Sequence, residues 1–393
     1  MLGFEYLIAP HSKEKFIEKY WGKRAVFMPN SADRFESLFG WGEVNHHLNH
    51  TRQNYDGMRL AHETKVLGPN EFAKVDYWLQ EGATFIINNV NRIDEVTEQF
   101  AEMLSCDLNT PVNINCYASC PSKQGFDVHF DLHDVFIIQT EGTKKWAVFE
   151  PTIQSPLHIQ NPEKGEPPTS DPYIECEMSV GDVLYIPRGH WHYAVATSPS
   201  IHLTVGPSSV SGAEFLNWIS KQLTNNDEFF RKDFPVADAS MFGGEQSSQA
   251  LNEHLNEFRS KIKEILDGAS FQEAFIRFCT SSNPLKRQSE LPSVWTLDDD
   301  ISQDTLFELP STQKTVIRYD DENASSVIYL RGEKINLENI PKPLIQAIFE
   351  PNQGEFCGRE ILKKCEAEKI DWIRVRDLLL LLAKNFGIIR LVS

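Results

Sequence analysis

A series of short β-rich runs between residues 24 and 209 constrains the fold more than any other feature of this chain. The runs concentrate β-branched and aromatic residues, and Gly, Pro, Asn and Ser separate them, as is typical of strands joined by turns. Helices do not alternate with them, so the pattern favours a sandwich or barrel over a parallel α/β sheet, with a few helices in front, including residues 12–21. The runs are RAVFMPN, ATFIINNV, PVNINCYASC, VFIIQT, KKWAVFEP, GDVLYIPRG and IHLTVGP.

The pattern becomes helical after residue 209. Ser211 and Glu214 have the spacing of a capping box ahead of FLNWISKQL, so a helix is predicted to begin there. Further along, apolar residues recur at alternating steps of four and three, which places them on one stripe of a helix. Such a stripe packs inside its own domain or joins two chains, and the sequence leaves both open. The stripe consists of Leu251, Leu255, Phe258, Ile262 and Ile265.

A third region begins near residue 288, with an acidic turn at 298–300 and two β-like runs, KTVIRY and SSVIYLRG. The closing order of PLIQAIFE, GREILKKCEA, WIRVRDLLLLLAKNFG and IIRLV is similar to a winged-helix unit. This region has no excess of Lys and Arg, so a structural or protein-contact role is favoured over nucleic-acid binding.

The composition limits the partners and the compartment. Asp and Glu number 56 against 38 Lys and Arg, and the net charge of −18 disfavours a phosphate backbone as the main partner and suits a basic peptide. The seven cysteines include no CxxC pair, which fits a reducing compartment. The start has no signal-peptide pattern, and the longest apolar run is far short of the roughly 20 residues of a membrane span. We expect a soluble, cytoplasmic protein.

The stretch HFDLHDVFIIQTEGTKKWAVFEP at residues 129–151 places polar side chains directly before an apolar run that is predicted to be a strand. His129 and Asp131 are two residues apart, so in a strand both point to one face, and His133 shares that face. An HxD pair alone is a weak signal. The distal PRGHWH turn adds His190 and His192, and one of these could complete a two-His, one-carboxylate triad for Fe(II).

Together, HFDLHDVFIIQTEGTKKWAVFEP and GDVLYIPRGHWH resemble the JmjC-type, cupin-fold 2-oxoglutarate oxygenases of the ribosomal-oxygenase branch. The resemblance implies a mixed α and β architecture in which a double-stranded β-helix is followed by a helical dimerisation region and a winged-helix domain. The expected domains are a JmjC/cupin catalytic domain with N-terminal helices at 1–209, a helical dimerisation or linker region at 210–287, and a winged-helix-like domain at 288–393. Fe(II), 2-oxoglutarate and O2 are the implied cofactor and co-substrates.

Carried over by position, the resemblance makes His129, Asp131 and His192 the iron ligands. His190 becomes a neighbour, because the family places its ligand at the second histidine of GHWH. His133 is assigned to the wall of the site or to packing. Asp134 is given no role.

The resemblance also implies contacts to 2-oxoglutarate. Lys144 corresponds to the family's cation for the distal (C5) carboxylate, a role that suits an ammonium with three donors. Lys145 is expected on the opposite strand face. Asn115, Tyr117 and Thr204 stand where the family has polar contacts to 2-oxoglutarate, although inward-facing strand residues of this kind are often only structural.

The implied activity is hydroxylation of a protein or peptide side chain, such as an arginine or histidine of a ribosomal protein. A tailoring hydroxylase of a peptide natural-product pathway is an alternative with the same chemistry. A cupin-like binding or scaffold protein without turnover, and a winged-helix transcription factor with a sensory cupin, are alternatives of other classes. We expect a homodimer, a basic protein partner, and neither a membrane nor a nucleic acid as partner.

Overall fold

The computed structural model describes residues 3–50, 57–63, 65–121, 126–157, 166–208, 210–235, 245–281, 301–309, 315–320, 325–349, 354–385 and 387–391. The chain divides into two compact units, Met1–Ser209 and Val210–Ser393, and each is described by itself. Within the described ranges, no helix combines the length and the apolarity that a membrane crossing needs.

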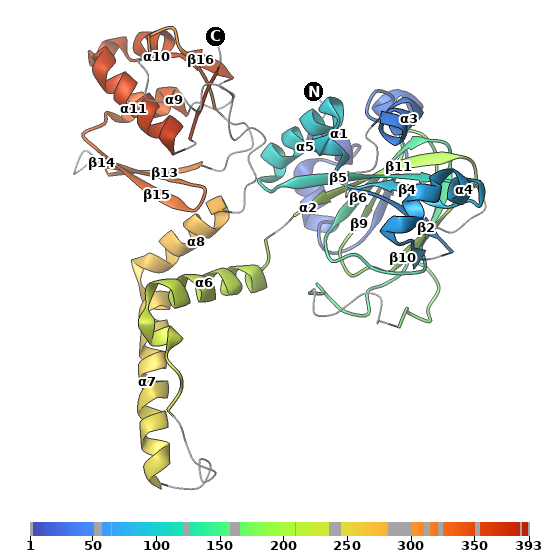
Figure 1. The fold of residues 1–393 in the computed structure, drawn as a ribbon, viewed down its shortest axis with the longest axis horizontal. Coiled ribbons are helices and arrows are strands. Elements are labelled where there is room, and N and C mark those ends of the chain that lie inside the picture. Colours follow the sequence, from blue (N-terminus) through green and yellow to red (C-terminus); the bar gives the residue numbers. More distant parts are fainter. Residues whose placement is uncertain are drawn as a thin grey trace. The chain divides into compact units, whose positions relative to one another are not determined.

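The first unit combines helices with eleven described strands (Figure 1). Its helices are α1 (Phe4–Ile8), α2 (Lys13–Lys19), α3 (Trp41–His50), α4 (Val75–Gln80) and α5 (Glu95–Leu108), with short 3-10 turns at Ala32–Phe35, Pro69–Lys74 and Val90–Arg92. Its strands are β1 (Val26–Met28), β2 (Met58–His62), β3 (Lys65–Val66), β4 (Thr84–Ile87), β5 (Val112–Ser119), β6 (Val135–Glu141), β7 (Lys144–Val148), β8 (Ile174–Met178), β9 (Val183–Ile186), β10 (His192–Ala196) and β11 (Ser200–Pro207).

These strands form two antiparallel sheets. The larger sheet has the order β1-β9-β6-β11-β5-β4-β2-β3, and the smaller has the order β10-β7-β8. Strand β11 lies at the centre of the larger sheet and pairs with β5 over eight residues, from Ser200 opposite Ser119 to Pro207 opposite Val112. The predicted mixed architecture with cupin-like facing sheets is confirmed at this level.

Strand β6 explains why the run VFII is apolar on both faces. Val135 and Ile137 point toward the smaller sheet and pack with Trp146, Val148 and Met178. Phe136 and Ile138 point the other way, into a core covered by α1, α2 and α5 (Figure 1). A strand between two apolar layers cannot alternate apolar with polar residues, so its sequence reads as a continuous greasy run.

Aromatic rings build the outer core. Phe16 of α2 stacks on Phe136 at a centroid distance of 5.8 Å and meets the Tyr185 ring edge-on at 5.0 Å. Burying a side chain of this size contributes roughly 1.5–3 kcal/mol, so this cluster anchors the N-terminal helices to the larger sheet. The cluster therefore fixes the outer face of the larger sheet, while the opposite face, toward the smaller sheet, carries polar residues.

Two turns close one end of the space between the sheets. Gly142 has φ +63° in the β6–β7 turn, and a Cβ atom there would lie 2.0 Å from the carbonyl oxygen of Pro199. The turns are further joined by a hydrogen bond from the Thr143 N–H to Ser198 Oγ at 2.8 Å. Only glycine permits both this backbone conformation and this close approach. Lys144 follows directly after this turn.

The second unit contains two small sheets and mostly short helices. The helices are α6 (Gly212–Asn226), α7 (Glu245–Asp267), α8 (Ala269–Ser281), α9 (Lys342–Ile348), α10 (Gly358–Lys364) and α11 (Trp372–Lys384), with 3-10 turns at Glu228–Arg231 and Glu366–Glu368. The strands are β12 (Leu306–Glu308), β13 (Thr315–Asp320), β14 (Ser325–Leu330), β15 (Glu333–Glu338), β16 (Glu355–Cys357) and β17 (Ile389–Arg390), in the orders β13-β14-β15 and β16-β12-β17.

The predicted helix start after residue 209 is confirmed. Ser211 Oγ accepts from the Glu214 N–H at 3.2 Å, and the Glu214 carboxylate accepts from the Ser211 N–H at 2.7 Å. Reciprocal bonding of this kind satisfies two donors at the start of α6.

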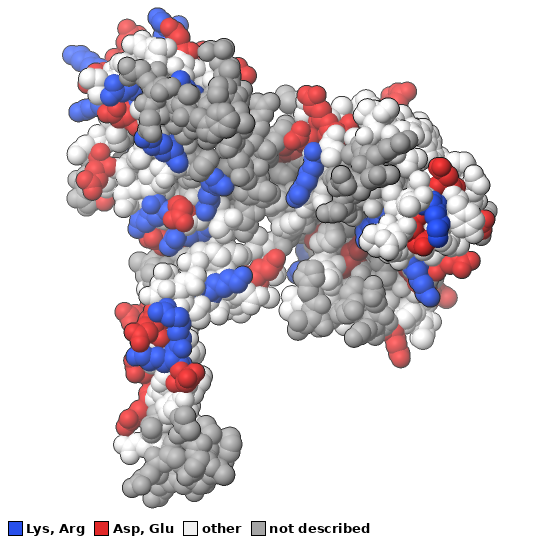
Figure 2. All heavy atoms as spheres, in the orientation of Figure 1, with Lys and Arg blue, Asp and Glu red and all other residues white. Residues whose placement is uncertain are grey.

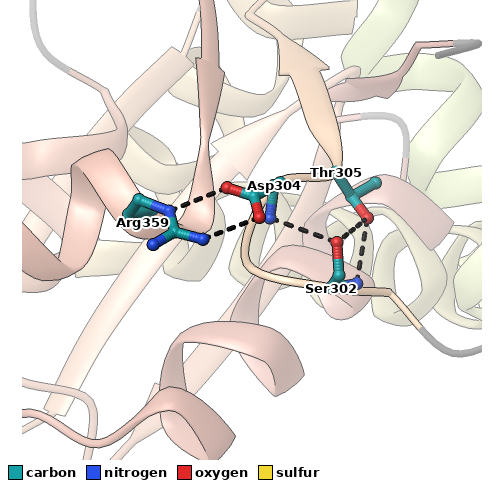
Figure 3. A network of polar contacts seen from close by, with 4 residues as sticks. All are labelled: Ser302, Asp304, Thr305 and Arg359. Carbon is teal, nitrogen blue, oxygen red and sulfur yellow. Dashed lines mark hydrogen bonds and ion pairs between the residues drawn. The ribbon is translucent and has the colours of Figure 1, made fainter.

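The C-terminal part of the second unit has three helices before its last strand, β17, where the sequence had indicated two. Helices α9, α10 and α11 share one apolar core with the two small sheets. Figure 3 shows how β12 is fastened to α10: Arg359 donates to both carboxylate oxygens of Asp304 at 2.8 and 2.7 Å, while Ser302 and Thr305 bond to each other across the same turn. The acidic turn predicted at 298–300 lies outside the described residues.

Candidate active site

An isolated β-bridge places His129 beside His192. The His129 N–H donates to the His192 carbonyl at 3.1 Å, and the His192 N–H donates to the His129 carbonyl at 2.7 Å. His192 also begins β10, whose other edge pairs with β7. The two imidazole rings therefore lie side by side, with centroids 4.5 Å apart.

Asp131 lies on the same side as His129, as the two-residue spacing predicts. Its backbone carbonyl accepts from the Gly189 N–H at 2.9 Å, which ties the HxD segment to the turn before His192. Asp131 Oδ2 is 3.7 Å from His192 Nε2, and one ligand atom from each of His129, Asp131 and His192 lies within 4.8 Å of the others. Among the described residues, no other group of three His, Cys, Asp or Glu side chains is arranged to hold a metal ion.

Backbone carbonyls set the tautomers of both histidines. His129 Nδ1 donates to the Asp127 carbonyl at 2.7 Å, and His192 Nδ1 donates to the His190 carbonyl at 3.0 Å. Each Nε2 therefore keeps its lone pair for a metal, in the arrangement that orients metal-bound histidines in general. Burial, reinforced by His129, lowers the pKa of His192 to about 4, so this imidazole is neutral at neutral pH.

His190 and His133, the other two histidines near the site in the sequence, lie outside the metal-binding group. His190 is buried, and its Nδ1 is 2.7 Å from the Tyr173 hydroxyl, which also accepts from the Ala25 N–H. His133 is exposed, and its ring packs over Gly206, where a Cβ atom would lie 2.7 Å from the ring. Neither joins the metal-binding group, and both help to shape its surroundings.

Lys144 is a buried cation without a carboxylate partner. It begins β7 and is 6% exposed, whereas Lys145 points outward as predicted. Lys144 Nζ donates to Ser119 Oγ at 3.0 Å and lies 3.3 Å from His202 Nδ1, and no described carboxylate forms an ion pair with it. Burial lowers the pKa of Lys144 to about 7. A lone buried ammonium is unfavourable unless something of opposite charge joins it.

The inner face of the larger sheet brings the remaining predicted residues together. Asn115 and Tyr117 lie two positions apart on β5 and therefore point to the same face. Thr204 of β11 lies directly opposite Asn115. Asn115 Oδ1 accepts from the Asn89 N–H at 2.9 Å, so its oxygen is engaged in holding the loop after β4. Burial, reinforced by Asp131, raises the pKa of Tyr117 to about 12, so its hydroxyl is protonated at neutral pH.

Sequence reasoning missed four residues on this inner surface. Three of them carried a detectable signal, because Ser119, His202 and Trp146 each lie two positions from a predicted site residue and so share its strand face. Arg59 carried none: it belongs to β2, and only the pairing of β2 with β4 and of β4 with β5 brings its guanidinium into hydrogen-bonding contact with Tyr117.

The inner face also carries buried polar atoms that lack partners among the described residues. They are Arg59 Nε, Gln139 Oε1, Trp146 Nε1 and Ser200 Oγ. Ser200 lies opposite Ser119, and Gln139 lies opposite His202, so these atoms share the face that Lys144 approaches. Buried polar atoms are normally satisfied, and a cluster of unsatisfied ones beside an unpaired ammonium fits a small carboxylate-bearing ligand. The two-His, one-Asp donor set likewise fits Fe(II).

Comparison with known proteins agrees with this geometry. Residues 86–215 match the family model of the JmjC domain. Ribosomal oxygenase 1 of Gallus gallus is 24% identical over 387 residues, covering 86% of this chain and 63% of that protein. Ribosomal oxygenase 2 of Rattus norvegicus is 29% identical over 217 residues, covering 51% of this chain and 46% of that protein.

Solved structures with a similar fold also include ribosomal oxygenases. The Escherichia coli ribosomal oxygenase YcfD, solved with cobalt and 2-oxoglutarate, superposes with a TM-score of 0.60 at 18% identity, covering 96% of this chain and 98% of that one. The chain spans about half to two thirds of the length of the two curated relatives named above. The predicted resemblance to JmjC-type ribosomal oxygenases is thus confirmed.

Proposed function

We propose that this chain, which carries a JmjC domain of the ribosomal-oxygenase type, is an Fe(II)- and 2-oxoglutarate-dependent oxygenase that hydroxylates a protein side chain. One observation carries the proposal: the His129, Asp131 and His192 cluster and the unpaired, buried ammonium of Lys144 lie within the same space between two sheets. A metal site alone would fit many functions. A metal site together with a buried, unpaired cation fits a ligand that binds the metal at one end and carries a carboxylate for the cation at the other.

Each proposed residue then has one task. The Nε2 atoms of His129 and His192 and a carboxylate oxygen of Asp131 hold the ion on one face, while Lys144 pairs with the distal carboxylate of 2-oxoglutarate. Tyr117, Asn115 and Thr204 line the wall between them. When bound, Fe(II), 2-oxoglutarate and O2 supply the oxidising chemistry that inserts one oxygen atom into a C–H bond and leaves succinate and carbon dioxide. The apolar core behind the site excludes water and keeps this geometry fixed.

The proposed substrate is a basic segment of a ribosomal protein, with arginine or histidine as the modified residue. Relatives named ribosomal oxygenases support this, and the net charge of −18 is compatible with a basic partner. Figure 2 shows Lys and Arg interspersed with Asp and Glu among the described residues of the face in view. The proposal therefore rests on the site and the relatives more than on surface charge.

We also propose the remaining parts of the layout: three domains at 1–209, 210–287 and 288–393, a winged-helix C-terminal domain that contacts protein, a cytoplasmic location, and a homodimer. Exposed apolar side chains on α7 support the dimer. Leu255 and Leu266 are 41% and 50% exposed on the side that also carries Phe258 and Ile262. The side chain of Ile265 lies outside the described residues.

Turnover of 2-oxoglutarate tests the function without knowledge of the substrate. The full chain reconstituted with Fe(II) should convert 2-oxoglutarate to succinate, and His192→Ala should abolish this conversion because one of three ligands is lost. His190→Ala is the matched control on the same turn and should keep most of the activity, because its ring faces Tyr173. Activity lost in the control and kept in His192→Ala would make His190 the ligand and contradict the assignment.

The substrate is tested by mass spectrometry of ribosomal proteins from cells with and without the enzyme, searching for one added oxygen atom. A modified ribosomal residue supports the proposal. A modified residue found only in a non-ribosomal peptide would point to the tailoring role, and an absence of any succinate formation would favour the binding or scaffold role.

A further inference from the structure

We propose that His202 is a positioning residue that aims the Lys144 ammonium at the distal carboxylate of 2-oxoglutarate. The inference rests on the proposed function and adds a residue that neither the metal triad nor the predicted co-substrate contacts include.

Packing holds the His202 ring in one orientation. The ring stacks on Tyr117 with a centroid distance of 4.9 Å and an angle of 2° between planes, because the two residues lie directly opposite each other on β11 and β5. Its other neighbour is Trp146, which meets it edge-on at 5.3 Å. The residue is 4% exposed. A ring confined on two sides in this way cannot turn its Nδ1 atom away from Lys144.

The Nδ1 atom faces the Lys144 ammonium. The two nitrogens are 3.3 Å apart, and a charged lysine has donors only, so Nδ1 must accept and the ring must carry its proton on Nε2. Burial, reinforced by Lys144, lowers the pKa of His202 well below its usual range, in agreement with a neutral acceptor.

Two acceptors leave one donor of Lys144 with a defined direction. Ser119 Oγ takes one N–H at 3.0 Å and His202 Nδ1 takes a second, so tetrahedral geometry fixes where the third points. A lysine side chain normally loses considerable rotamer freedom when it binds. Here that freedom is already lost before the ligand arrives, which favours binding.

A purely structural role for His202 and a positioning role predict different effects of its replacement on ligand affinity. If His202 only filled space, its replacement would affect all 2-oxo acids alike. If it aims Lys144, its replacement should affect only those acids that carry a distal carboxylate. Pyruvate lacks that group and reaches the metal without reaching Lys144, so the ratio of the two affinities separates the two roles.

The test is calorimetric titration of the Co(II)-loaded full chain with 2-oxoglutarate and with pyruvate. His202→Phe keeps an aromatic ring on Tyr117 and removes the acceptor, and we expect about tenfold weaker 2-oxoglutarate binding, with pyruvate binding unchanged. His202→Asn can present an amide oxygen near the position of Nδ1 and should lose less. His47→Phe is the matched control, because His47 is also buried and stacks on Phe39 with an angle of 4° between planes.

The outcomes are distinguishable. No 2-oxoglutarate binding by the wild-type chain would refute the proposed function itself. Normal wild-type binding with an unchanged affinity in His202→Phe, or with equal losses for both acids, would refute the role of His202 and leave the function standing. If the Phe variant does not fold, the ratio of the two affinities in His202→Leu, which also lacks an acceptor, decides in the same way.

Discussion

Lys144 is the residue at which stability and function conflict most clearly. Its ammonium is almost fully buried, its neighbours are Ser119, His202 and the Trp146 ring, and none of them carries a negative charge. An unpaired buried charge destabilises the fold it sits in. Retaining such a group makes physical sense where a ligand later supplies the missing charge.

Replacing this lysine should therefore stabilise the protein while disabling it. Lys144→Met keeps the volume and removes the charge, so we expect a higher melting temperature, with each ~1 kcal/mol gained worth about 2–4 °C in a unit of this size. The affinity for 2-oxoglutarate should fall at least about tenfold, because a charge-assisted bond is lost. Thermal unfolding and calorimetry measure the two effects. Lower stability with unchanged affinity would contradict the assigned role.

The pKa of Lys144 also predicts how binding depends on pH. Burial lowers it to about 7 in the free protein, so the side chain is charged below that pH and neutral above it. The affinity for 2-oxoglutarate should fall above pH 7 by about tenfold per pH unit, with uptake of a proton on binding. The folded state also holds fewer protons than the unfolded state between about pH 7 and the ordinary lysine pKa, so this group makes stability rise with pH in that window.

Calorimetry at several pH values, in buffers of different ionisation enthalpy, measures both the affinity and the proton uptake. Lys144→Arg is the control, because a guanidinium keeps its charge over this range and should remove the pH dependence. A wild-type affinity that stays constant from pH 6 to pH 9, a range chosen to span the shifted pKa, would contradict the prediction.

At the scale of elements, the site depends on how one turn is fastened to one strand. The turn between β9 and β10 leads directly into His192, the first residue of β10. Asp134, just before β6, accepts from the Arg188 N–H in this turn and from the Tyr185 hydroxyl of β9, each at 3.1 Å. Gly189 adds its bond to the Asp131 carbonyl. Sequence reasoning gave Asp134 no role, yet it joins the two segments that carry the proposed metal ligands.

Loss of this carboxylate should loosen the metal site without touching a ligand. We expect Asp134→Ala to weaken Co(II) binding by roughly 10–100-fold, the usual effect of removing a group that supports metal ligands. Asp182→Ala is a matched control, because Asp182 is equally buried and accepts from the Asn30 and Ser179 N–H groups instead. It should lower stability and leave Co(II) affinity unchanged. Equal metal affinity in both variants would show that Asp134 acts on stability alone.

At the scale of the whole molecule, α7 presents apolar side chains that the described residues of one chain leave exposed. Leu255, Phe258 and Ile262 of the predicted stripe share this side with Leu266, which the prediction did not include, and a second copy is the partner we propose for it. Burying exposed leucines of this kind would make the stability of the protein depend on its concentration.

Light scattering after size-exclusion chromatography tests this assembly. The wild-type chain should elute with twice the chain mass, and Leu266→Glu should shift it to the monomer, because a charge placed in an apolar interface is strongly unfavourable. Ser260→Glu, at an exposed position on the other side of α7, should remain dimeric. A monomeric wild type would refute the dimer without affecting the proposed chemistry.

Strand periodicity made a large part of the site predictable. The spacing of His129 and Asp131, of Asn115 and Tyr117, and the outward position of Lys145 all follow from side chains that alternate between two faces. Because this rule is local, it acts within a run of five to eight residues, as in β7 and β5. The capping box at Ser211 followed from an equally local rule.

The sequence by itself determined the β-rich architecture, the start of α6 and the set of residues from which the metal ligands could be drawn. Only the tertiary structure decided among them, because His133, His190 and His192 satisfy the same alternation and differ only in what lies opposite. His192 forms the β-bridge to His129. The His190 ring contacts the Tyr173 hydroxyl, and the His133 ring packs over Gly206. His202 contacts Lys144 across the two sheets, at a separation of 58 residues in the chain, and no local pattern encodes that contact.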